Sequence, residues 1–76
     1  MEQLKEFIQN ELKELIFRTV DFDEALISTK TLDSIILIDL IVAIEEFADI
    51  SIPTSDVNEE NFETITIMSK FIMSIK

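Results

Sequence analysis

The chain has 76 residues, enough for one small domain, and combines a hydrophobic content of 47% with a formal net charge of -10. It contains no Cys and no His, which excludes disulfides, Cys/His zinc sites and catalysis by a thiol or an imidazole. Because few basic residues are present to neutralise phosphates, the charge also argues against nucleic-acid binding and favours basic partners.

The N-terminal part of the chain predicts a helix followed by a long loop. Over residues 2–17 the charged residues take one side of the helix, and the apolar residues recur at helical spacing on the other. These apolar residues are Leu4, Phe7, Ile8, Leu12, Leu15 and Ile16. The period is lost over 18–33, which we expect to be a loop with room for one helical turn, anchored by Phe22, Leu26 and Leu32.

Three further helices are expected after this loop, the second of them short. Asp33 is a suitable N-cap for a helix over 34–47, and Pro53 closes the connection that follows. Asp56 and Glu59 have the spacing of a capping box for a helix over 56–61. The last helix spans 65–75 behind Thr64, with Ile65, Met68, Phe71 or Ile72, and Ile75 facing inward. The predicted fold is therefore all-α: a four-helix bundle forming a single domain, 1–76.

The helix over 34–47 has apolar residues on two sides. At 100° per residue, one arc forms a core face of Ile36, Leu37, Leu40, Ala43, Ile44 and Phe47. Ser34, Asp39, Glu45 and Glu46 mark the opposite, solvated side, yet Ile35, Ile38 and Val42 fall among them. Apolar side chains rimmed by carboxylates are typical of an interaction surface. The alternative is a central helix that is buried on all sides, with Ile38 at the border of the core.

The charge is concentrated around this helix. Residues 31–69 carry nine acidic residues and no basic residue, which indicates one anionic face. The candidate for chemistry within it is Ser34, in the first helical turn, where unpaired N–H groups and the helix dipole favour a phosphate ester. No His, Cys or neighbouring Lys is available as a base, so Ser34 is expected to receive a group and the chain is not expected to be an enzyme.

These residues resemble the acyl carrier protein family. The resemblance is carried by Leu32-Asp33-Ser34-Ile35, followed by Asp39-Leu40, Ala43-Ile44-Glu45-Glu46 and Ile52-Pro53, and it extends over the whole chain. The segment 56–65 is more similar to D-alanyl carriers and stand-alone carriers of secondary metabolism than to the fatty-acid type. The chain departs from the family pattern at 30–32, where Lys-Thr-Leu stands in a stretch that usually contains Gly.

The resemblance implies a cofactor and a set of partners. Ser34 would carry 4′-phosphopantetheine beside Asp33, and the thiol of this group would hold an acyl or aminoacyl cargo as a thioester. Partners would be a phosphopantetheinyl transferase, a loading ligase, and downstream synthases or transferases with basic patches. The residues that would contact them are Ile35, Ile38, Asp39, Val42, Glu45 and Glu46. The alternative is a small acidic adaptor that binds a basic partner through 34–47 without modification.

No segment has the pattern of a targeting signal, a membrane anchor or a metal site. The first six residues mix charges and lack an apolar core. The most apolar run, 35–44, has ten residues and contains Asp39, so it is too short to span a bilayer. We therefore expect a soluble, cytoplasmic, monomeric protein without membrane insertion.

Overall fold

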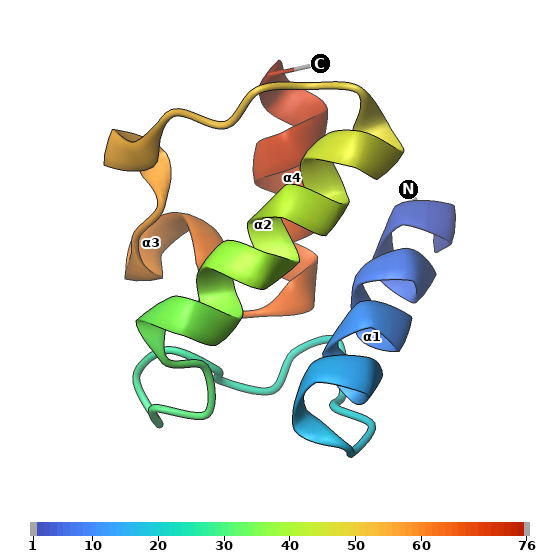
Figure 1. Ribbon diagram of the computed structural model, residues 1–76, viewed down its shortest axis with the longest axis vertical. Helices are drawn as coiled ribbons and strands as arrows, with labels where there is room; N and C mark the ends of the chain where they lie inside the picture. The colour runs from blue at the N-terminus through green and yellow to red at the C-terminus, as the bar shows by residue number, and fades with distance from the viewer. Residues whose placement is uncertain (1, 76) are drawn as a thin grey trace.

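The computed structural model describes residues 2–75 and is all-helical over that range. Its helices are α1 (Glu2–Ile16), α2 (Ser34–Ala48), the 3-10 turn η1 (Thr54–Asp56), the short α3 (Glu59–Phe62) and α4 (Ile65–Ile75). α1 packs against both α2 and α4, and α3 packs against α4. The N-terminal end of α1 lies beside the C-terminal end of α2, so these two helices run in opposite directions (Figure 1). The four-helix fold predicted from the sequence is confirmed.

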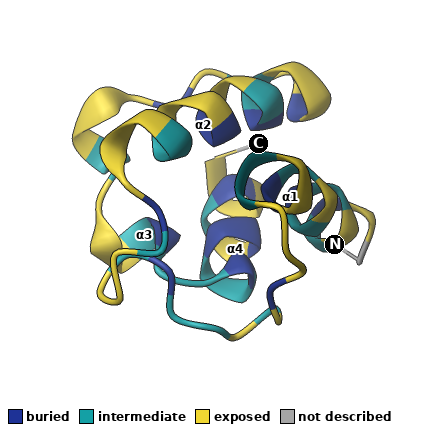
Figure 2. Ribbon diagram, turned by 60° about the horizontal axis from the view of Figure 1, so that its bottom comes forward, coloured by how far each residue is buried: buried dark blue, intermediate teal, exposed yellow. Residues whose placement is uncertain are grey.

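The core lies between α1, α2 and α4, with α2 on the outside of the bundle. α1 buries Leu4, Ile8 and Leu12, and its other apolar residues pack against this cluster. Figure 2 shows the residues of α2 that face the other helices as buried and its outer side as exposed. The alternative of a central helix that is buried on all sides is therefore wrong.

The buried side of α2 is rotated relative to the predicted one. Its buried residues are Leu40, Ile41, Ile44 and Ala48. Of the residues predicted to face inward, Ile36, Leu37 and Ala43 are only partly buried, and Phe47 is 49% exposed. The physical reason is that Phe47 stacks on Phe7 at the margin of the α1–α2 contact, with ring centroids 4.1 Å apart. Because Phe47 lies at this margin, Ile41 and Ala48 are the residues that face the core in the middle and at the end of α2.

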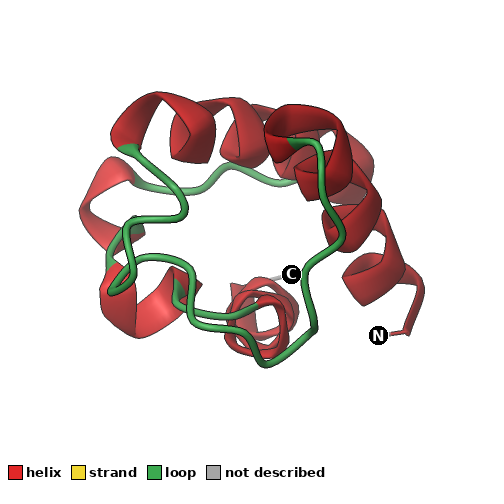
Figure 3. Ribbon diagram, turned by 90° about the horizontal axis from the view of Figure 1, so that it is seen from below, coloured by secondary structure: helices red, strands yellow, loops and turns green. Residues whose placement is uncertain are grey.

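The connection between α1 and α2 is a long ordered loop over residues 17–33. Figure 3 shows this end of the molecule, with the loop passing between the helices. Val20, Leu26 and Leu32 are buried in the core, whereas Phe22 is partly buried under the Lys5 ammonium group. The loop contains turns and no helical turn. Leu26 and Leu32 thus act as predicted, and Phe22 also packs against the core although it is only partly buried. Val20 is an anchor that the sequence pattern did not indicate.

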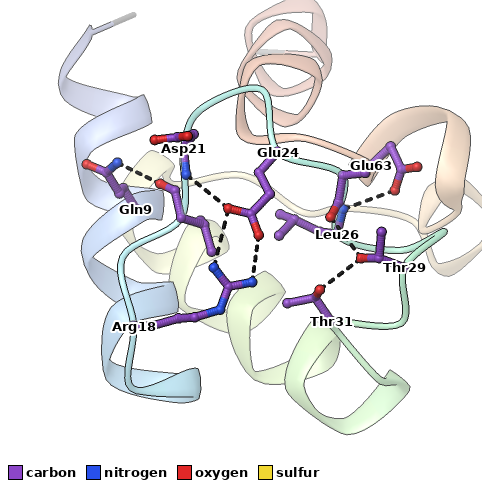
Figure 4. A network of polar contacts seen from close by, with 10 residues as sticks. Gln9, Arg18, Asp21, Glu24, Leu26, Thr29, Thr31 and Glu63 are labelled. Atoms are coloured by element: carbon purple, nitrogen blue, oxygen red, sulfur yellow. Dashed lines mark hydrogen bonds and ion pairs between the residues drawn. The ribbon is translucent and has the colours of Figure 1, made fainter.

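Hydrogen bonds hold this loop to α1 and to the corner between α3 and α4 (Figure 4). Gln9 of α1 donates to the Val20 carbonyl at 2.8 Å. Arg18 and Glu24 form a salt bridge within the loop at 2.6 Å. The Leu26 N–H donates to the Glu63 carbonyl at 2.8 Å. The loop that leads to α2 is therefore positioned by residues on both sides of the bundle.

The third helix differs from its prediction. It begins at Glu59 rather than at 56, and its N-cap is Asn58, whose Oδ1 accepts the Asn61 N–H at 3.0 Å. Asp56 ends the η1 turn that opens after Pro53, because its N–H already donates to the Pro53 carbonyl at 2.9 Å. The capping box of Asp56 with Glu59 is therefore wrong.

The bounds of α4 and its cap are as predicted, but its inward side differs at one end. Thr64 Oγ1 accepts the Ile67 N–H at 3.0 Å. The buried residues are Ile65, Met68, Ser69 and Ile72. Ile75 is 39% exposed, since it lies at the edge of this arc in the last turn. The Ser69 hydroxyl is satisfied in the core by donating to the Thr66 carbonyl at 2.9 Å.

A chain without glycine must place other residues where the backbone turns left-handed. Phe17, Lys30 and Asp49 have φ values of 63°, 61° and 56°. Asp tolerates this region better than most residues, while a bulky Phe or Lys is less favourable there. Lys30 therefore occupies a backbone position that glycine would adopt at lower cost.

Candidate functional site

The candidate site is the exposed N-terminal end of α2. Asp33 caps the helix, and its Oδ1 accepts the Ile36 N–H at 2.9 Å, as the sequence predicted. Ser34 is the first helical residue and is exposed. The N–H groups of Ser34 and Ile35 lie in the first turn, where no carbonyl group of the helix is available to accept their hydrogen bonds. These groups and the positive end of the helix dipole suit a phosphate ester on the Ser34 hydroxyl.

Three aliphatic side chains are exposed along the same side of α2. Ile35, Ile38 and Val42 are 71%, 59% and 48% exposed. Their spacing of three and four residues aligns them in a stripe that starts beside Ser34. Three aliphatic side chains on one helix, each with about half or more of its surface exposed, offer apolar contact area to a partner.

The stripe borders a hollow between α2 and the segment that follows it. The hollow has a volume of about 360 Å³ and is lined by Ile38, Ile41, Val42, Glu45, Ile52, Thr54 and Val57. The sequence predicted Ile38, Val42 and Glu45 of this hollow but not Ile41 of the same helix. It also did not indicate three residues that follow α2, Ile52, Thr54 and Val57. No periodic pattern could have revealed them, because they belong to an irregular connection that returns to α2 only in the folded chain.

The predicted carboxylates of α2 have different environments. Asp39 and Glu46 are exposed. Glu45 is partly buried, and its Oε2 accepts the Ile52 N–H at 2.7 Å, which holds the return segment against the helix. Glu45 therefore has a structural contact that the sequence did not indicate, and Asp39 and Glu46 are the α2 carboxylates that face water.

A second carboxylate fixes the loop that leads to Ser34. Glu63 Oε1 accepts three consecutive backbone N–H groups, from Leu26, Ile27 and Ser28, at 3.2, 2.7 and 3.0 Å. Hydrogen bonding from Ser28, through its side chain and its backbone, and from the Ile27 and Leu26 backbone lowers the pKa of Glu63. We call this contact the Glu63 clamp. Because it joins the α3–α4 corner to the first loop, it sets the approach of the chain to α2.

Removing the charge of the clamp should change how stability depends on pH. The folded-state pKa of Glu63 lies below its ordinary value of 4.5, so the clamp stabilises the fold above that pH, and the contribution disappears as pH falls through the lower folded value. Glu63→Gln should lower the urea midpoint at neutral pH. On acidification, the urea midpoint of the variant should fall less than that of the wild type. Urea unfolding between about pH 7 and about pH 3 measures both effects. Glu60→Gln, at an exposed position of α3, is the control, and equal pH profiles for the two variants would contradict the clamp.

The described residues contain neither a metal site nor a membrane-spanning helix. Among the side chains that the structure describes, no three Asp or Glu residues gather as metal ligands. Among the described residues, no helix has the length and apolar character needed to cross a bilayer.

Comparison of the chain with models of known families, with characterised proteins and with solved structures finds no significant match. The fold and the site thus define a small helical bundle with an exposed serine at the start of an acidic helix.

Proposed function

We propose that this protein is an acyl or aminoacyl carrier in which Ser34 bears a covalent 4′-phosphopantetheine group. The observation that supports this most directly is the exposed Ser34 at the first position of α2, next to an exposed aliphatic stripe and the carboxylates of the same helix. The resemblance of the sequence around Ser34 to acyl carrier proteins points the same way. When bound, the group supplies a terminal thiol that can hold the cargo as a thioester.

The residues around Ser34 fit this group chemically. The hydroxyl oxygen of Ser34 would attack the β-phosphorus of coenzyme A and form a phosphodiester. The pyrophosphate bond of coenzyme A would break, and 3′,5′-ADP would leave. The hydroxyl proton would pass to a base of the transferase, since the chain has no His or Cys to accept it. The N–H groups of the first turn would suit the resulting phosphodiester, which carries one negative charge.

The partner enzymes would recognise the outer side of α2. Ile35, Ile38 and Val42 offer apolar contact area, while Asp39 and Glu46 offer charges that attract a basic patch at long range. The absence of basic residues from 31–69 means that no cation of the same segment offsets this attraction. Apolar area would supply affinity, and the carboxylates would supply orientation and a faster encounter.

The proposal is tested by the mass of the protein after enzymatic modification. The apo protein is incubated with coenzyme A, magnesium and a transferase of broad specificity that is shown to be active on another carrier. The wild type should gain the mass of one phosphopantetheine, and Ser34→Ala should gain none. Ser55→Ala removes an exposed serine of η1 and should be modified like the wild type.

The same experiment separates the carrier from the unmodified adaptor. If the wild-type protein gains no mass with a competent transferase, the carrier proposal is wrong, and a binding role of the outer side of α2 is left. If the wild type is modified, incubation of the holo protein with adenylating ligases and either fatty acids or amino acids identifies the class of cargo. A thioester is then recognised by its release with hydroxylamine.

A further inference from the structure

A groove between α1 and α2 lies near the C-terminal end of α2, and none of the residues of the aliphatic stripe lines it. It has a volume of about 300 Å³ and is lined by Phe7, Glu11, Ala43, Glu46 and Phe47; we call it the α1–α2 groove. The two rings are stacked with an interplanar angle of 12°. Ala43 precedes Phe47 by one helical turn, and its methyl group leaves space beside the stack. Since Phe47 keeps about half of its surface exposed, an aromatic surface is accessible at the groove.

Carboxylates from both helices line this aromatic surface. Glu11 follows Phe7 by one turn of α1, and Glu46 is the neighbour of Phe47 on α2. Among the side chains that the structure describes, the only salt bridge joins Arg18 to Glu24, so neither groove carboxylate is paired with a described cation. An aromatic surface between two such carboxylates is complementary to a flat organic cation.

We propose that the α1–α2 groove binds an arginine side chain presented by a basic partner protein. A guanidinium group can stack on a ring and donate hydrogen bonds to carboxylates in its own plane at the same time. A lysine ammonium group is a compact and more strongly hydrated charge, which makes it less suited to this arrangement. The groove shares Glu46 with the side of α2 that we propose meets partner enzymes, but it is remote from the modified residue, because Glu46 lies about 18 Å along α2 from Ser34.

The test is a titration with two short peptides, followed by backbone NMR shifts at physiological salt. The probes are blocked alanine-based octapeptides, one with two arginines and the other with two lysines. The arginine peptide should shift the resonances of Phe7, Glu11, Ala43, Glu46 and Phe47 and should bind about fivefold more tightly than the lysine peptide. Ser34→Ala should bind it like the wild type, so failure of the carrier proposal would not affect this result.

Matched variants separate the groove from the overall negative charge. Glu11→Gln combined with Glu46→Gln should weaken binding of the arginine peptide about fivefold or more, and Phe47→Ala should weaken it about as much. Glu6→Gln combined with Glu60→Gln makes the same change of net charge at exposed positions outside the groove. The proposal is overturned if both double variants lose equal affinity, if the lysine peptide binds equally well, or if the shifts lie elsewhere.

Discussion

Phe62→Ala is expected to cost about 3–5 kcal/mol of stability, which is most of the reserve of a domain of this size. Phe62 is the last residue of α3, is fully buried, and packs edge-to-face on Phe71 with ring centroids 5.5 Å apart. Four residues cannot form a stable helix alone, so α3 depends on this anchor. Its loss would also loosen the neighbouring Glu63 clamp and the first loop.

The matched control is Phe17→Ala, which removes the same side chain from a position that is 90% exposed. It should change the unfolding free energy by no more than about 0.5 kcal/mol. Urea unfolding followed by circular dichroism compares the two variants, and the wild-type slope allows the midpoints to be converted to free energies. Similar losses for both would mean that Phe62 does not anchor α3 as the structure describes.

Asp39→Lys is expected to slow modification of Ser34 by about tenfold at low ionic strength and by less at physiological salt. This expectation rests on the proposed carrier function. Asp39 is exposed on α2, so replacing it changes the charge that a basic patch would meet without touching the core. Glu46→Lys, farther from Ser34, should have a smaller effect in the same direction. Initial rates with a phosphopantetheinyl transferase at several salt concentrations measure the effect.

Glu6→Lys is the control for this charge reversal. It produces the same net charge from an exposed position near the N-terminal end of α1, which lies beside the far end of α2 from Ser34 (Figure 1). Its rate should stay within about twofold of the wild type, and all variants should retain wild-type helicity. Equal rates for Asp39→Lys and Glu6→Lys would mean that the transferase does not recognise the acidic side of α2.

The three longer helices and their caps could be predicted because their signals are local. Asp33 and Thr64 cap α2 and α4 by accepting the N–H group three residues later in the chain. This spacing is the same at most helix starts, so it can be read from the sequence. The exposure of Ile35, Ile38 and Val42 follows from the same helical period that buries Leu40 and Ile44. Spacing alone therefore places the candidate serine at the helix start and the stripe on one side of the helix, while the fold decides that this side is exposed.

The short third helix could not be placed in the same way. Asp56 and Asn58 are both good cap residues, so local preference does not choose between them. The choice is made by Pro53, which starts a 3-10 turn through Asp56, and by Phe62, which must reach the core. The rotation of the buried side of α2 has a similar origin, since it depends on the stacking of Phe47 on a ring of another helix.

The sequence shows a serine at the start of an acidic helix with aliphatic residues beside it. It can do so because residues three or four positions apart lie on the same side of a helix. The contacts that hold this helix end in place depend on tertiary structure. The Glu63 clamp joins residues 35 to 37 positions apart, and the α1–α2 groove combines two helices separated by a long loop. Such pairs depend on how the core packs, and no periodicity within one segment encodes them.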